Sequence, residues 1–235
     1  MRILLTSDWH LDWVTHGVSR FEDLERAVEA TVRHAVDTRC DAYGFCGDLC
    51  DPDSGSRVFR CAALAIDAAL DLSDAEIPSF WLAGNHDVIE DGTGGTTLAP
   101  LAALGSREIV VCEQPDVATV GGLVVALLPF TASSHAYDAE ECVRNLDNHQ
   151  HVHMVVGHLS VPGVVPGEET ADMPRGRDVV LPVDEIKRRL PRARIVQGHY
   201  HRRQVTKDGV IIVGSLARLT FNEEGNDPGF LVLEV

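Results

Sequence analysis

Histidines, aspartates and one asparagine recur at five places in the sequence, each directly after a short apolar run. The five places are Asp8-Trp9-His10, Gly47-Asp48, Gly84-Asn85-His86-Asp87, Gly157-His158 and Gly198-His199-Tyr200-His201. Imidazole, carboxylate and amide groups without a thiolate suit Mn, Fe or Zn better than Mg or Ca. One such place alone is more often a structural turn than a site. Five together predict a metal-binding site.

The number of candidate ligands suits two divalent metal ions, most simply Mn, with Fe or Zn as alternatives. The seven candidates are Asp8, His10, Asp48, Asn85, His158, His199 and His201. Asp48 is the natural bridge, with Asp8, His10 and His201 on one ion and Asn85, His158 and His199 on the other. A shared carboxylate holds two ions about 3.5–4 Å apart, as in two-metal hydrolases. The positions left over would take water and a substrate phosphate.

The elements that must position these residues read as alternating strands and helices. Apolar runs at 2–7, 42–46 and 80–83 predict buried strands, and helical spacing predicts helices over 19–38 and 56–72. Ser19 and Glu22 form a capping-box signature at the start of the first helix. This β-α-β-α-β order predicts an α/β fold with parallel strands and right-handed crossovers, whose ends share one sheet edge.

The second half of the chain reads less regularly. It predicts strands at 107–112, 153–156, 193–197, 210–213 and 230–235, a hairpin over 117–130 around Gly121-Gly122, helices at 137–149 and 183–190, and an exposed loop over 161–177. No linker or repeat divides the chain, so we expect one domain over residues 1–235.

The composition limits the cellular locations in which we expect the protein. No apolar run is long enough to span a membrane, and the start of the chain lacks the pattern of a signal peptide. The six cysteines form no C-x-x-C pair, which predicts reduced thiols in a cytoplasmic protein with no membrane contact. Cys46 and Cys50 flank Gly47-Asp48, so a zinc site there stays open as a minor alternative.

The charge is strongly negative but uneven. A net charge of −16 argues against a surface built broadly for nucleic acid. However, eight basic and no acidic residues lie between Lys187 and Lys207. This basic segment is either a phosphate-facing patch or a solvated helix end and loop, and the sequence leaves both open.

The five motifs, in this order and over nearly the whole chain, resemble the calcineurin-like metallophosphoesterase superfamily. The resemblance implies a four-layered fold in which a β-sandwich is flanked by α-helices. It also implies phosphoester hydrolysis by a metal-bridging hydroxide. His86 matches the family's non-ligand histidine, which stabilises the phosphoryl group and helps protonate the leaving oxygen. Asp87 would then orient His86 from behind.

The end of the chain is similar to SbcD-type DNA repair nucleases. The similarity lies in GHYHRRQ (198–204), VGSLARLTFNEE (213–224) and PGFLVLEV (228–235). It implies a manganese-dependent DNA nuclease. Asp51 and Tyr200, which stand close to candidate ligands in the sequence, and Arg202 and Arg203 of the basic segment are our candidate substrate-binding residues.

Two departures from these nucleases affect the expected substrate and partners. Asp51 stands where they typically carry a histidine used in exonuclease action. We also expect no DNA-capping domain and no ATPase-docking segment. We therefore expect DNA or another phosphodiester as substrate, and an ATPase partner is in doubt.

Two other functions remain. One is a cyclic nucleotide or other small-molecule phosphodiesterase. The other is a non-catalytic metal-binding scaffold, a class that usually loses metal ligands. All seven candidate ligands and His86 are present here, which favours an enzyme.

Overall fold

The computed structural model describes residues 1–132, 136–146, 151–165 and 179–235. Most of the loop expected over 161–177, with the acidic residues Glu168, Glu169 and Asp172, lies outside these ranges. So does the end of the helix expected over 137–149.

The first of two large sheets contains five strands in the order β13-β1-β4-β5-β6. Its parallel strands are β1 (Arg2–Thr6), β4 (Ala42–Phe45), β5 (Ser79–Leu82) and β6 (Ile109–Cys112). The last strand, β13 (Leu231–Glu234), pairs antiparallel with β1 and so brings the two chain ends together. The expected strands are therefore present, with one antiparallel edge.

The second sheet contains six strands in the order β11-β12-β10-β9-β8-β7. The strands are β7 (Asp116–Val120), β8 (Leu123–Leu128), β9 (Met154–Gly157), β10 (Arg194–Gln197), β11 (Gln204–Val205) and β12 (Ile211–Ile212). The expected hairpin joins β7 and β8, and both turn glycines, Gly121 and Gly122, have positive φ. A two-residue turn with this backbone matches the twist of the paired strands.

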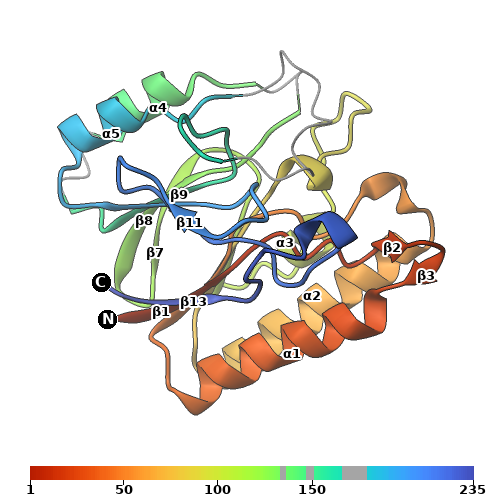
Figure 1. Ribbon diagram of the computed structural model, residues 1–235. Helices are drawn as coiled ribbons and strands as arrows, with labels where there is room; N and C mark the ends of the chain where they lie inside the picture. Colours follow the sequence, from red (N-terminus) through yellow and green to blue (C-terminus); the bar gives the residue numbers. More distant parts are fainter. Residues whose placement is uncertain (133–135, 147–150, 166–178) are drawn as a thin grey trace.

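Helices cover the outer face of each sheet (Figure 1). Helices α1 (Phe21–Asp37) and α2 (Arg57–Asp74) lie against the first sheet, and α4 (Ala139–Asn145) and α5 (Val183–Arg189) against the second. The short α3 (Ala99–Ala102) precedes β6. Within the described ranges, no helix is both long and apolar enough to cross a membrane.

Three hydrophobic clusters make this a four-layered structure. Alternate residues of β1 point to opposite faces, as in any strand. Ile3 and Leu5 join a cluster between the sheets, and Leu4 joins the cluster under α1 and α2. A third cluster lies between the second sheet and α4 and α5. The expected β-sandwich flanked by α-helices is confirmed.

The expected capping box at Ser19 is wrong. Helix α1 begins one residue later, after Arg20, and has no side-chain cap. Ser19 lies in a small hairpin made of β2 (Val14–Thr15) and β3 (Val18–Ser19), where it pairs with Val14. That pairing holds Ser19 outside the helix, and its hydroxyl accepts a hydrogen bond from the Phe21 amide at 3.3 Å.

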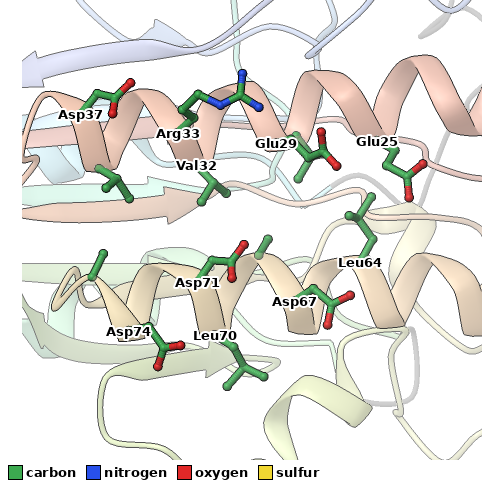
Figure 2. Close-up of a pocket in the computed structure, with 14 residues that line it drawn as sticks. Glu25, Glu29, Val32, Arg33, Asp37, Leu64, Asp67, Leu70, Asp71 and Asp74 are labelled. Atoms are coloured by element: carbon green, nitrogen blue, oxygen red, sulfur yellow. The ribbon is translucent and has the colours of Figure 1, made fainter.

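A groove of about 1080 Å³ runs between α1 and α2 on the outside of the molecule (Figure 2). Val28, Val32 and Ala68 are buried along its floor. Its lining includes the carboxylates Glu25, Glu29, Asp37, Asp67, Asp71 and Asp74, with Arg33 as the cation among the described lining residues. None of the predicted site residues lines this groove.

Candidate metal centre

The predicted site residues follow five strands that belong to two different sheets. From the first sheet, Asp8 and His10 follow β1, Asp48 follows β4, and Asn85 opens the short turn η2 (Asn85–Asp87) after β5; from the second, His158 follows β9, and His199 and His201 follow β10. The expected single parallel edge is therefore wrong. The side chains meet because the stacked sheets turn the carboxyl ends of these strands toward each other.

Asp8, His10 and His201 form the first cluster. One ligand atom of each lies within 4.8 Å of the others. Nε2 of His10 is 3.1 Å from Nε2 of His201. Asp8 is fully buried, and neither of its carboxylate oxygens has a hydrogen-bond partner among the described residues. Burying an unpaired carboxylate is costly, and a divalent cation among these three groups would remove that cost.

Asp48 lies between this cluster and the next. Its Oδ2 is 3.1 Å from Nε2 of His158 and 3.6 Å from Nε2 of His10. Its Oδ1 accepts a hydrogen bond from the backbone amide of His86 at 2.9 Å. Asp48 also shares possible ligand groups with Asp8 and His158, and with His10 and His86. This position suits a bridging ligand.

Asn85, His158 and His199 form the second cluster. Oδ1 of Asn85 is 2.9 Å from Nδ1 of His199 and 3.1 Å from Nε2 of His158. Nδ1 of His158 is 2.7 Å from the carbonyl oxygen of Cys46. A proton on Nδ1 would be donated to that carbonyl, leaving the Nε2 lone pair directed into the cluster.

Burial and the charges of neighbouring residues strongly shift the pKa values of these groups. Burial raises the pKa of Asp8 and lowers the pKa of His199 to about 3. Burial would also raise the pKa of Asp48, but the charges of His158 and His86 hold it well below its usual range. His158 shows the opposite balance: burial works to lower its pKa, and Asp48 raises it to about 9. Such opposed shifts in one cluster are typical of functional sites.

The backbone at four of these residues is left-handed. Asp8, His10, Asp48 and His199 have φ of 52°, 43°, 64° and 75°. This region is uncommon for residues with a side chain, and it clusters at functional sites. Here it turns the chain sharply at the strand end, which directs the side chain inward.

The glycine before Asn85 is required by the close approach of Asp48. A Cβ at Gly84 would collide with the Asp48 carboxylate and its backbone nitrogen. We expect Gly84→Ala to displace that carboxylate and slow phosphoester hydrolysis roughly 10²-fold, the cost of about 1 Å of misplacement. Steady-state kinetics would measure this. Gly225→Ala is the matched control, since no heavy atom lies within 4 Å of its Cβ; equal rates for the two variants would contradict the expectation.

Asp87 is expected from the sequence to orient His86, but its hydrogen bonds in the described part of the chain lead elsewhere. Its buried carboxylate accepts hydrogen bonds from the amides of Gly84, Asp48 and Leu49 at 2.8–2.9 Å and from the Thr97 hydroxyl at 2.6 Å. None of the hydrogen bonds found for it in the described residues reaches His86. Asp87 therefore ties the β4 and β5 turns together and fixes Asp48 from behind.

His86 lies at the open side of the centre, facing a different carboxylate. Its side chain is 43% exposed, and its Nδ1 is 3.8 Å from Oδ2 of Asp51. The His86 and His10 rings meet edge to face at 4.9 Å. Asp51 also caps the turn η1 (Pro52–Ser54) by accepting from the amide of Asp53. Asp51 is thus placed against His86 rather than alone in solvent.

The other expected substrate-binding residues lie in different surroundings. The Tyr200 hydroxyl accepts from the amide of Val161 at 3.0 Å, and its ring packs edge to face on His199. Arg203 donates from Nε to the carbonyl of Val213 at 3.1 Å. These contacts give Tyr200 and Arg203 structural roles, whereas Arg202 is exposed.

Three of the eight basic residues of the segment, all on α5, are paired with acids that flank it in the sequence. Arg188 and Arg189 both contact Glu185, and Lys187 contacts Asp208 at 3.1 Å. The two arginines hold the pKa of Glu185 at about 2. The charge on α5 is therefore met within the protein, which favours the solvated-helix interpretation for that part of the segment.

Glu223 is a site residue that the sequence reasoning missed. It is 1% exposed, and its Oε1 is 2.6 Å from Nδ1 of His201. It also accepts from the backbone amides of Leu219 and Thr220, which anchors the turn η6 (Phe221–Glu223). A carboxylate behind a ligand histidine fixes the ring and raises its basicity. Glu223 lies in segment 213–224, which the sequence analysis singled out for its similarity to SbcD-type nucleases. The sequence therefore marked the segment but assigned no role to this residue.

We expect Glu223→Gln to weaken divalent-metal binding about 10–100-fold, as is usual for partners of ligand histidines. The amide keeps the shape and one acceptor oxygen but loses the charge beside His201. Titration of the metal-free protein with Mn²⁺ would measure the change. Glu224→Gln, at the exposed neighbouring position, serves as the control. Equal affinities for the two variants would argue against this role.

Comparison with known proteins agrees with this geometry. A family model described as calcineurin-like phosphoesterase matches residues 1–203. Two curated relatives are SbcD chains of the nuclease SbcCD. The one from Staphylococcus saprophyticus is 24% identical and covers 100% of this chain; the one from Escherichia coli K12 is 25% identical and covers 96%. This chain spans only 66% and 62% of their lengths.

Solved structures show the same fold at low identity. A dimetal phosphatase from Danio rerio has a TM-score of 0.58 at 12% identity, covering 99% of this chain and 91% of its own. Purple acid phosphatase PPD1 from yellow lupin seeds has a TM-score of 0.51 at 13% identity, covering 90% of this chain and 43% of its own.

Proposed function

The chain belongs to the calcineurin-like phosphoesterase family and is a metal-dependent phosphoesterase, and we propose that it is a two-metal phosphodiester hydrolase that cleaves DNA. The observation that carries the proposal is the buried Asp8 carboxylate, whose unpaired oxygens lie beside His10 and His201. An ionised carboxylate buried in this way is costly, and a cation held between these groups would offset that cost.

Seven side chains would hold the two ions. Asp8, His10 and His201 suit one ion, Asn85, His158 and His199 suit the other, and Asp48 suits both. We propose Mn²⁺ because the donors are imidazole, carboxylate and amide without thiolate, with Fe or Zn as alternatives. When bound, such ions lower the pKa of water and offset the negative charge of a phosphate.

His86 is proposed as the group that protonates the leaving oxygen. It is half-exposed at the mouth of the centre, so a substrate can reach it. Asp51 faces its Nδ1 at 3.8 Å. A carboxylate on that side can hold the ring so that Nε2, when it carries a proton, is directed toward the leaving oxygen and can donate that proton to it. In this proposal Asp51 has the orienting role first expected of Asp87.

DNA as substrate rests on the relatives. The two SbcD relatives align over 96–100% of this chain. This chain spans only about two thirds of their length. Of the relatives' activity, we therefore propose only phosphodiester cleavage for this chain.

A small phosphodiester, such as a cyclic nucleotide, is the second candidate. A pocket of about 140 Å³ beside His86 is lined by the carboxylates Asp51, Asp53 and Glu90. Three of the eight cations of the basic segment are already paired, with Glu185 and Asp208. The negative charge around this pocket repels the additional phosphates of a long strand, which favours a substrate with a single phosphate.

Hydrolysis with added Mn²⁺ tests both candidates. Single- and double-stranded DNA, cyclic nucleotides and bis(p-nitrophenyl) phosphate are assayed in parallel, with His86→Ala as the inactive reference. Cleavage of DNA that the variant loses supports the nuclease. Turnover of only the small diesters supports the second candidate. Metal binding without turnover of any substrate would instead favour a non-catalytic metal-binding scaffold.

A further inference from the structure

A separate pocket of about 310 Å³ lies between two short segments next to the metal centre. Residues Trp13–His16, which include strand β2, form one wall, and residues Leu219–Asn222 form the other. The volume is at the lower end of the range for small-molecule sites. It suits a single flat ring system.

Both walls are attached directly to residues of the metal centre. The Trp13 ring meets the His10 ring edge to face at 5.8 Å, and the Trp13 amide donates to the His10 carbonyl at 2.9 Å. Phe221 opens the turn whose last residue, Glu223, contacts His201. A group in this pocket would therefore lie beside a phosphate bound at the centre.

The two walls are also braced against each other. The Thr15 hydroxyl donates to the carbonyl of Leu219 at 2.8 Å. Arg20 links the same segments, because its side chain donates to the carbonyl of Arg218 at 3.0 Å and its amide donates to the carbonyl of Trp13 at 2.9 Å. The pocket is thus formed before any ligand binds, which reduces the entropic cost of binding.

The lining is aromatic and carries no carboxylate, lysine or arginine. Phe221 is 75% exposed, and its ring lies 5.3 Å from that of His16 at an angle of 40°. The pocket beside His86 contains three carboxylates instead. In a chain with a net charge of −16, an uncharged aromatic hollow beside the metal centre favours a neutral planar group.

We propose that this pocket stacks one unpaired nucleobase of the substrate, next to the phosphodiester being cleaved. The inference rests on the proposed function and adds to it. A base reaches an aromatic wall only after it leaves its own stack and pair, so the substrate would be a single strand, a frayed end or a nucleotide. Thr15 and Asn222 offer polar atoms for the edge of the base.

The test compares two single-stranded substrates that share a backbone. One is a short oligothymidylate, and the other carries abasic tetrahydrofuran residues in place of thymidine. With Mn²⁺, the wild type should cleave the first with at least about 10-fold higher kcat/KM, from the usual strength of base stacking on an aromatic side chain. Phe221→Ala should reduce this ratio about 10-fold, and Phe221→Trp should retain it.

Phe59→Ala is the matched control, because Phe59 is 77% exposed on helix α2 and does not line this pocket. It should change neither the ratio nor the rate. Wild-type protein that cleaves both substrates equally, or a Phe221→Ala variant with the wild-type ratio, would overturn the pocket assignment while leaving phosphodiester hydrolysis in place.

A binding measurement separates failure of the pocket from failure of the proposed function. Thymidine 5′-monophosphate is titrated against the tryptophan fluorescence of the protein. Trp9 and Trp81 are fully buried, so quenching that Trp13→Phe removes reports this pocket. Quenching that Phe221→Ala weakens, in a protein that hydrolyses no diester, would keep the pocket and reject the nuclease. Absence of quenching would reject the pocket.

Discussion

Asp48→Asn is expected to reduce phosphodiester hydrolysis by a factor on the order of 10³, with the fold intact. The Asp48 carboxylate lies between Nε2 of His158 and Nε2 of His10, and approaches both clusters through a single oxygen. The amide keeps the size of the side chain and the acceptor for the His86 amide. It loses the charge that could attract two cations at once.

The measurement is kcat on bis(p-nitrophenyl) phosphate together with Mn²⁺ bound per chain. Asp227→Asn is the control, since Asp227 is an exposed acid that lines neither of the pockets beside the centre. The control should keep both quantities. An Asp48→Asn variant that binds two ions and turns over normally would rule out Asp48 as the bridging ligand.

Asp87→Ala is expected to lower the free energy of unfolding by roughly 3–5 kcal/mol. The carboxylate is fully buried and accepts from four backbone amides and the Thr97 hydroxyl. Truncation leaves these donors buried without partners, each at a cost of roughly 1–3 kcal/mol. Burial raises the pKa of Asp87 to about 6, so at a pH of about 7.5 most of the wild type still has the ionised acceptor.

Urea unfolding of the metal-free protein at that pH would measure this loss without a contribution from bound metal. Asp87→Asn should lose less, because one acceptor oxygen remains. Asp71→Ala, at an exposed position of α2, should change little. Should Asp87→Ala instead unfold like the wild type and shift the pH profile of hydrolysis, the sequence-based role of orienting His86 would be restored.

The sequence was sufficient for the longer strands, because each apolar run ends in glycine or polar residues at the observed turn, but the two-residue strands β2, β3 and β11 were not expected. It could not show that the strands divide between two sheets. The hairpin at Gly121-Gly122 lies in the second sheet, where β8 pairs with β9, and an apolar run carries no mark of the sheet it joins. The capping box failed for a related reason, since pairing of Ser19 with Val14 outweighs local capping preference.

The candidate ligands were also accessible from the sequence, because residue type and position after a strand are local properties. Their supporting groups were not. Asp87 adjoins His86 in the chain, yet its partners include amides 38 and 39 residues away. Glu223 reaches His201 across 22 residues. Such pairings depend on how loops return to the site, which no spacing rule specifies.

The division of the seven candidate ligands between two sheets has a consequence for cohesion. Asp8, His10, Asp48 and Asn85 come from one sheet, and His158, His199 and His201 from the other. Ions held by both sets would cross-link the two halves of the sandwich, joining residues as far apart in the chain as Asp8 and His201. The cross-link would be reversible and as strong as the affinity for the ion. Tighter metal binding would then raise the free energy of unfolding of both halves of the sandwich together, because the ions bind only the folded protein.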